Sequence, residues 1–193
     1  ILMIILMIVA ATHNARKKGT SIQGITWKLV VTFIFIEILT QGILLGLQIV
    51  PPTAQYIIPI SGMMIGNSMV LGILFLNRFT AELKNHPDQT ELILSLGGTP
   101  KQAVHNQLVS AIKASTIPTI ESQKTMGLVQ LPGMMSGQII AGADPVQAVQ
   151  FQLLVLFLLL TTAVVTAILL GFLSYPTLFN ERMQFLKERI QAE

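Results

Sequence analysis

The stretch FQLLVLFLLLTTAVVTAILLGFLSY, residues 151–175, carries no charged side chain. A helix that crosses a bilayer needs about 20 predominantly apolar residues, at a rise of about 1.5 Å each, and this stretch is long enough. The whole chain shares its character, because 52% of the residues are hydrophobic and only 11% are charged. The alternating pattern of a membrane-spanning strand is missing. We therefore predict an all-α integral membrane protein, built as a polytopic bundle of transmembrane helices.

Other apolar segments extend this bundle. Together with residues 151–175 they give five spans or part-spans, and we treat residues 1–193 as a single transmembrane domain; the other segments are Ile1–Ala11, Leu29–Val50, Tyr56–Leu76 and Met126–Ala143. The chain opens inside an apolar run that lacks the basic flank and cleavage site of a signal peptide, so we expect part of the domain to precede it. The chain has no cysteine, which excludes disulfides and thiolate sites.

The positive charges lie on one side of the predicted spans. All twelve lysines and arginines fall in the polar segments on that side: Arg16, Lys17, Lys18, Lys28, Arg78, Lys84, Lys101, Lys113, Lys124, Arg182, Lys187 and Arg189. The positive-inside rule makes this side cytoplasmic and leaves Asp144 as the only charge outside. The basic groups adjoin spans in short runs, so the net charge of +3 reports topology, and we expect no nucleic-acid partner.

A polar segment, residues 77–125, separates the third and fourth predicted spans. Within it, ELILSLGGTPKQAVHNQLVSAIKAS, residues 91–115, predicts two short helices that meet at an elbow. Gly97 and Gly98 form a helix stop, Thr99 offers an N-cap oxygen, and Pro100 suits the first turn of the next helix. Ala103, Val104, Leu108, Ala111 and Ile112 form an apolar stripe along that helix, which Pro118 interrupts. The segment is either a cytoplasmic coupling loop that docks a soluble partner or an amphipathic loop resting on lipid headgroups.

One acidic residue, Glu37, lies near the middle of a predicted span. A carboxylate at that depth costs about 2.5 to 3.5 kcal/mol, so Glu37 has to face protein, water or a cation, or carry a proton. Thr40 and Gln41 lie one turn further on and extend a polar strip on the same face. Glu37 is therefore a candidate substrate or proton site, and the alternative is a protonated packing residue.

Glycines recur at the spacing of close helix packing in three spans, which predicts that these spans lie in the interior. The pairs are Gly42 with Gly46, Gly62 with Gly66, and Gly133 with Gly137. Two pairs belong to a near-repeat, GMMIGN and GMMSGQ, in which an amide follows the second glycine. These amides are Asn67 and Gln138, and we regard both as candidates for a translocation path.

The fourth predicted span contains a proline. Pro132 removes a backbone donor, so we expect a bend at Gln130 to Gly133, and irregular backbone at membrane depth has to be buried in protein or line water. Gln130, Met134 and Gln138 would share one face of this span. The segment is a path wall, a hinge or a silent packed kink. The candidate path or hinge residues are Glu37, Asn67, Gln130, Pro132, Gly133, Met134, Gly137 and Gln138.

Several kinds of catalytic site have no signature in the sequence. It contains no phosphate-binding lysine loop and no HExxH motif. The three histidines, His13, His86 and His105, are scattered through polar segments, which predicts neither a metal site nor an enzyme. The chain itself is expected to bind no cofactor, so any work it performs has to be powered from elsewhere.

Three blocks of sequence closely resemble the FetB family of iron-export ABC transporter permeases, which includes plant aluminium-tolerance relatives. The blocks are GMMIGNSM (62–69), LSLGGTPKQA (94–103) and IPTIESQKTMGLVQLPGMMSGQIIAGADPVQAV (117–149). The resemblance implies a multi-pass protein of a bacterial inner membrane, or of a plant endomembrane. It also implies a FetA-type ATPase subunit that carries ATP and Mg, and a second copy of the permease.

The elbow is also similar to the coupling loop of ABC importers, where a short helix docks on the ATPase. The residues that carry this likeness are Glu91, Leu96, Gly97, Gly98, Thr99 and Pro100. Gly98 departs from the family pattern, where we expect alanine, and should loosen the elbow. The implied substrate is iron or a related transition-metal cation. The alternatives are a nucleotide sugar such as UDP-glucose, or a partner-independent proton-coupled transporter or channel centred on Glu37.

Overall fold

The computed structural model describes residues 2–18, 24–126, 133–180 and 183–186, and these residues form helices without strands. The helices are α1 (Leu2–Lys18), α2 (Ile25–Gly46), α3 (Ala54–Asn85), α4 (Pro87–Ser95), α5 (Pro100–Ala103), α6 (His105–Thr125), α7 (Gly133–Ile140), α8 (Pro145–Ser174) and the 3-10 turn η1 (Tyr175–Leu178). A single antiparallel bridge joins Phe179 to Phe185 in the described part of the chain. The predicted all-α class is confirmed.

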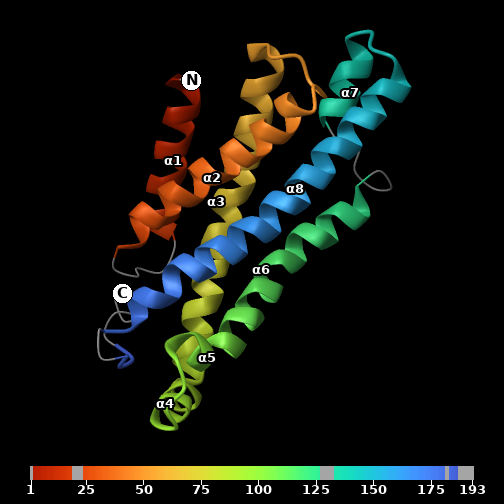
Figure 1. Cartoon of the computed structure of the whole chain (residues 1–193). Helices are drawn as coiled ribbons and strands as arrows, with labels where there is room; N and C mark the ends of the chain where they lie inside the picture. The colour runs from red at the N-terminus through yellow and green to blue at the C-terminus, as the bar shows by residue number, and fades with distance from the viewer. Residues whose placement is uncertain (1, 19–23, 127–132, 181–182, 187–193) are drawn as a thin grey trace.

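Helix α3 is the centre of the bundle. It packs against α1, α2, α6 and α8, and it runs almost the whole length of the molecule in Figure 1. The two turns that precede α3 and α8 lie at one end, and α4 and α5 lie at the other. The short helices α4 and α5 follow α3 and precede α6, so they lie at the end of the molecule opposite the two turns.

Three of the described helices are long and apolar enough to cross a membrane. They are Ile25–Gly46, Ala54–Asn85 and Pro145–Leu178, and they confirm the predicted spans at residues 29–50, 56–76 and 151–175. Helix α1 follows the predicted part-span at residues 1–11 and continues through three basic residues to Lys18. The predicted span at residues 126–143 is only partly described, because α7 is a helix of 8 residues and residues 127–132 lie outside the described part.

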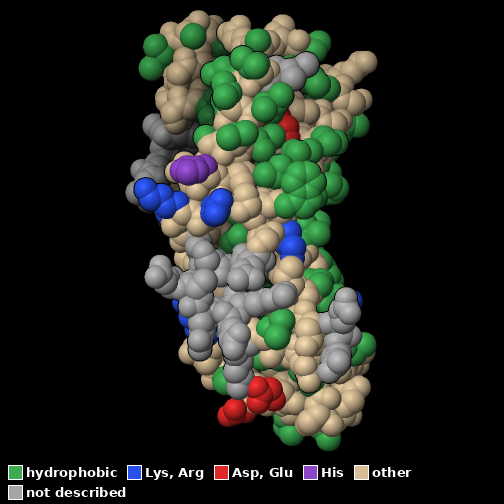
Figure 2. Space-filling view, turned by 90° about the vertical axis from the view of Figure 1, so that its left-hand side faces the viewer, with side chains coloured by type: hydrophobic (Ala, Val, Ile, Leu, Met, Phe, Trp, Pro, Cys, Tyr) green, Lys and Arg blue, Asp and Glu red, His purple; other side chains and the backbone are tan. Residues whose placement is uncertain are grey.

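The surface repeats the charge pattern of the sequence. Figure 2 shows hydrophobic side chains gathered over the upper half of one face, with lysine and arginine side chains at about mid-height. A group of acidic side chains lies near the lower end, where Figure 1 places α4. This distribution fits the predicted arrangement of spans above a polar end.

Helix α6 continues past the proline at which the predicted apolar stripe is interrupted. Pro118 lies inside α6, which continues to Thr125. An internal proline costs a helix about 3 kcal/mol, and packing along α3 and α8 offsets that cost. Leu108 and Ala111 are buried in this contact. Residues 77–125 are therefore not a free loop, because α3 enters the segment as far as Asn85 and α6 returns along the bundle.

The glycines that permit close packing are not those that the sequence predicted. A Cβ atom at Gly62 would contact the side chain of Met7 at 3.6 Å, but nothing in the described structure lies within 4 Å of one at Gly42, Gly46, Gly66, Gly133 or Gly137. The close approaches occur instead at Gly72 and Gly171. At Gly171 a Cβ atom would lie 2.8 Å from Leu108 and 3.3 Å from Phe75. The prediction failed because spacing along one helix does not reveal which face meets a neighbour.

We expect Gly171→Ala to lower the stability of the bundle by about 1–2 kcal/mol, because overpacking at a tight contact forces neighbouring side chains to shift. The measurement is thermal unfolding of the detergent-solubilised protein. Gly66→Ala is the matched control, since the added methyl group meets nothing and removes a flexible residue from a helix. Equal midpoints for the two variants would show that α6, α3 and α8 do not meet closely at Gly171.

Candidate functional site

The elbow between α4 and α5, residues 96–100, has the backbone geometry that the sequence predicts. Helix α4 ends at Ser95, and Gly97 adopts a left-handed conformation with φ of 84°. The Gly98 amide then donates to the Ile93 carbonyl at 2.9 Å, which satisfies an acceptor at the helix end. Glycine adopts the left-handed conformation with little strain, so the backbone conformation at position 97 explains why glycine is needed there.

The start of α5 is capped by side chains. The Gln102 amide donates to Thr99 Oγ1 at 3.4 Å, and the Thr99 amide donates to Gln102 Oε1 at 2.8 Å. This reciprocal pair is a capping box, and Pro100 occupies the first turn. The predicted N-cap at Thr99 is confirmed. The turn is therefore held by bonds on both sides of the glycines.

The structure contradicts the expectation that Gly98 loosens the elbow and that alanine would suit the position. A Cβ atom at Gly98 would lie 2.5 Å from Ile93 Cγ2 and 2.8 Å from the Ile93 carbonyl oxygen. The second of these atoms is backbone and cannot rotate away. Gly98 is thus a tight contact that lets the turn fold back on α4.

Two leucines at or near the elbow expose apolar side chains to solvent. Leu92 is 60% exposed and Leu96 is 80% exposed, although both lie in a polar part of the chain. Large apolar side chains exposed beyond the spans mark an interaction surface. Glu91 also lies on this surface, one residue before Leu92.

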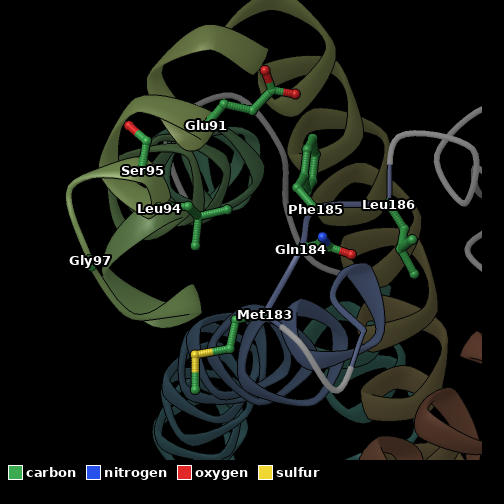
Figure 3. A pocket seen from close by; sticks show the side chains of 9 residues that line it. Glu91, Leu94, Ser95, Gly97, Met183, Gln184, Phe185 and Leu186 are labelled. Atoms are coloured by element: carbon green, nitrogen blue, oxygen red, sulfur yellow. The ribbon is translucent and has the colours of Figure 1, made fainter.

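A groove of ≈ 710 Å³ lies between the elbow and the C-terminal segment (Figure 3). Glu91, Leu94 and Gly97 line it on the helix side. Residues 183–186 line the opposite side. Sequence reasoning missed this second wall, because the only local signal is a few apolar residues after η1. Their position depends on Leu178 and Phe179, which anchor the segment in the core.

Glu37 is held in a buried polar cluster between α2 and α3. The Ser61 hydroxyl donates to Glu37 Oε1 at 2.5 Å, and the Gln41 amide nitrogen donates to the same oxygen at 3.2 Å. The Gln41 nitrogen also donates to Ser61 Oγ at 2.8 Å. The predicted polar strip is confirmed for Glu37 and Gln41, while Ser61 was not predicted. Thr40 is buried too, but its hydroxyl has no hydrogen-bond partner among the described residues.

Apolar layers lie on both sides of this cluster. Leu44, Ile60 and Met64 belong to one hydrophobic cluster, and Phe33 and Ile65 belong to the other. Along the helices, one hydrophobic cluster lies on each side of the polar group formed by Glu37, Gln41 and Ser61. Glu37 and Ser61 are therefore buried between two apolar layers, while Gln41 is half-buried.

Two amides bind the backbone of α8. Asn67 Nδ2 donates to the Leu159 carbonyl at 3.2 Å, and Gln123 Nε2 donates to the Leu156 carbonyl at 3.1 Å. Asn67 thus connects α3 to α8, and its predicted place on the path stays a prediction. Gln123 was not predicted, since one amide on a polar helix gives no distinct signal. These bonds fix α3 and α6 against neighbouring turns of α8.

The predicted path residues of the fourth span are only partly brought together. Gln138 lines a cavity of ≈ 230 Å³ with Tyr56 and Phe151, near the turn that follows α2. Met134 packs against the cluster that contains Met64. Gly133 and Gly137 lie exposed on α7. Gln130 and Pro132 lie outside the described residues, so the predicted hinge stays a prediction.

Metal ligands are sparse in the described ranges. No group of three or more His, Cys, Asp or Glu side chains comes together there. Glu37 is accompanied by hydroxyl and amide groups, which are weak, hard ligands.

The comparisons with known proteins place the whole bundle in one family. The model described as Uncharacterised protein family (UPF0014) matches residues 1–179. The chain belongs to this family. It is a multi-pass membrane permease of the FetB type, located in the inner, or plasma, membrane. No solved structure matches the chain significantly.

The relatives described here cover three quarters of the chain or more. The UPF0014 membrane protein YjkA of Bacillus subtilis is 54% identical over 95% of this chain and 74% of its own length. The protein named "Probable iron export permease protein FetB" of Escherichia coli is 38% identical over 100% of the chain and 74% of its own length. The Protein ALUMINUM SENSITIVE 3 of Arabidopsis thaliana is 36% identical over 76% of the chain and 54% of its own length.

We expect Gly98→Ala to destabilise the elbow by about 1–3 kcal/mol, because the new methyl group meets the Ile93 carbonyl and forces the backbone out of its turn. Hydrogen exchange of the α4 and α5 amides in the intact protein measures the effect. Ser95→Ala is the control, since it removes only an exposed side-chain bond to Leu92. Unchanged exchange in Gly98→Ala would contradict the tight contact.

Proposed function

We propose that this permease is the transmembrane subunit of an ABC exporter, powered by a separate FetA-type ATPase subunit. The observation that carries the proposal is the capped elbow. It combines a glycine-determined turn with exposed Leu92 and Leu96 at the end of the molecule opposite the outer turns. A protein that only spans a bilayer has no use for such a surface, whereas a soluble subunit can bind it.

The working unit in this proposal contains two permeases and two ATPases. ATP and Mg bind to the ATPase, and this chain binds neither. Closure of the ATPase dimer moves the elbow and thereby favours one of two arrangements of the bundle. The elbow is joined to the spans through α3, which is one helix from Ala54 to Asn85. In this proposal, α3 transmits the movement of the elbow to the spans, and the path changes between a closed and an open state.

The cargo in the proposal is iron or another transition-metal cation. It is supported by the name of the Escherichia coli relative and by the oxygen ligands around Glu37. A nucleotide sugar is the second candidate, because the described residues contain no dense ligand cluster for a metal. A proton-coupled transporter or channel without an ATPase is the third, and a buried acid in a span favours it.

The decisive test is binding of the ATPase subunit to the intact permease. We expect Leu96→Ser to weaken co-purification about tenfold or more, because a central apolar contact is worth about 1.4 kcal/mol or above. Ile140→Ser is the matched control, since Ile140 is 86% exposed at the opposite end. Equal binding by the two variants, or transport by liposomes that contain the permease alone, would refute the ABC assignment.

The same complex discriminates the cargo. ATPase stimulation is measured with Fe(II), Mn(II), Cu(I) and UDP-glucose at matched ionic strength. Stimulation by Fe(II) or another of these cations supports metal export. Stimulation by UDP-glucose alone moves the assignment to a nucleotide sugar and leaves the role of the elbow intact.

A further inference from the structure

Helix α6 runs beside α8 in Figure 1, although it is not among the described helices that are apolar enough to cross a membrane. Two contacts fix the alignment of the two helices. Gln123 Nε2 donates to the Leu156 carbonyl at 3.1 Å, and a Cβ atom at Gly171 would lie 2.8 Å from Leu108. The two contacts are the same number of residues apart on both helices. Helix α6 therefore runs antiparallel to α8 and keeps level with it.

The contact with Leu156 places the end of α6 at membrane depth. Leu156 is the twelfth of the 30 residues of α8, so it lies about 17 Å from the start of the helix and about 27 Å from its end. The hydrocarbon layer of a bilayer is about 30 Å thick, and α8 is about 45 Å long. Wherever α8 crosses the layer, Leu156 is inside it. Gln123 and the neighbouring residues of α6 are therefore level with the hydrocarbon.

The outward face of α6 carries charges. It consists of exposed residues three or four positions apart, which share one side of a helix: Lys113, Ile117, Glu121 and Lys124. Lys124 Nζ lies 2.8 Å from Glu121 Oε1, and the two side chains are 64% and 61% exposed. These two residues flank Gln123 in the sequence, so an exposed ion pair lies at the depth of Leu156.

The exposed side chains of α8 at the same depth are apolar. Leu153 is 49% exposed, and Phe157, which follows Leu156, is 69% exposed. These side chains suit lipid. Charged side chains inside a membrane are costly and almost always face the interior of a bundle or a water-filled cavity. The outward face of α6 therefore has to meet water or protein.

We propose that the face of α6 formed by Lys113, Ile117, Glu121 and Lys124 lines a water-filled passage across the membrane, and that a second copy of this chain forms the opposite wall. The face is on the outside of the described chain, so another protein surface has to keep lipid away from it. Glu121 and Lys124 have opposite charges. About a two-fold axis, the acid of one copy lies toward the base of the other, and the face is complementary to itself.

The proposal deepens the proposed function and rests on it for the pairing of two permeases. None of the candidate path residues from the sequence belongs to α6, because the polar composition of residues 105–125 predicts a segment outside the membrane. The elbow leads directly into this helix, since α5 ends at Ala103 and α6 begins at His105. A displacement of the elbow therefore also displaces the wall of the passage.

Single-cysteine variants test for water along the face. Residues 1–193 contain no cysteine, so an introduced thiol is the only one among them. Glu121→Cys and Ile117→Cys are made in the whole permease in nanodiscs, where both membrane faces are open to a charged methanethiosulfonate. We expect both thiols to react at least about tenfold faster than that of Phe157→Cys, because the reactive thiolate forms in water and not in lipid. Ile117→Cys keeps every charge of the face.

Phe157→Cys is the matched control, since Phe157 is 69% exposed and adjoins Leu156. Slow reaction of all three variants would show that the face of α6 is not in water. Fast reaction of all three would show that this level of α8 is not in lipid. Either result would overturn the proposal.

Cross-linking tests the second copy. A bifunctional maleimide with a flexible spacer is added to the same variants. We expect Glu121→Cys to give a covalent dimer on a denaturing gel and Phe157→Cys to stay monomeric. Fast thiol reaction without a dimer would refute the second copy as the opposite wall. Binding of the ATPase at Leu96 is measured separately by co-purification, so a failure of this proposal is distinguishable from a failure of the proposed function.

Discussion

The structure depends on one constraint, which is that polar groups carried into the spans have to find their partners inside the protein. Lipid offers no hydrogen bonds, so each unsatisfied group costs several kcal/mol. Helix α8 meets the constraint through threonine hydroxyls that donate to its own carbonyls, as Thr166 does to Thr162 at 2.6 Å. Asn67 and Gln123 add donors from α3 and α6. The same bonds that satisfy the groups also fix which helices are neighbours.

The cluster around Glu37 satisfies this constraint only for one carboxyl oxygen. A purely structural cluster would gain from a donor to Oε2 as well, and the described part of the bundle supplies none. Thr40 and Ser68, also buried on α2 and α3, have hydroxyls without a partner in the ranges that the structure describes. Unsatisfied polar groups at this depth destabilise the closed conformation. They therefore lower the stability of this arrangement of the helices.

The sequence predicted the helical class, three spans and the elbow, because each has a local cause. Apolar length determines a span, and Gly97, Thr99 and Pro100 determine the stop and the cap through their own backbones. The Glu37 and Gln41 pair was also predictable, since residues four apart share a helix face. These features need no knowledge of the rest of the fold.

The features that failed or were missed depend on contacts between distant segments. The continuation of α6 past Pro118 was not predicted, because it depends on packing on α3 and α8, which outweighs the local penalty. Ser61 is one of many serines until α3 places it beside Glu37. The need for glycine at position 98 was also not predictable, because only the folded turn brings the Ile93 carbonyl close to this residue.

The elbow and the Glu37 cluster lie on one mechanical element. Ser61 is near the start of α3, and the elbow follows its far end after α4. A continuous α-helix resists bending, so a displacement at one end of α3 reaches Ser61 as a movement of the whole helix. Gly97 and Gly98 are fixed by a positive φ and a backbone contact, which is the rigidity that the proposed coupling to an ATPase requires of the elbow. A shift of α3 against α2 changes the distance between Ser61 and Glu37. The hydrogen bond between these two residues joins the two helices in the polar cluster.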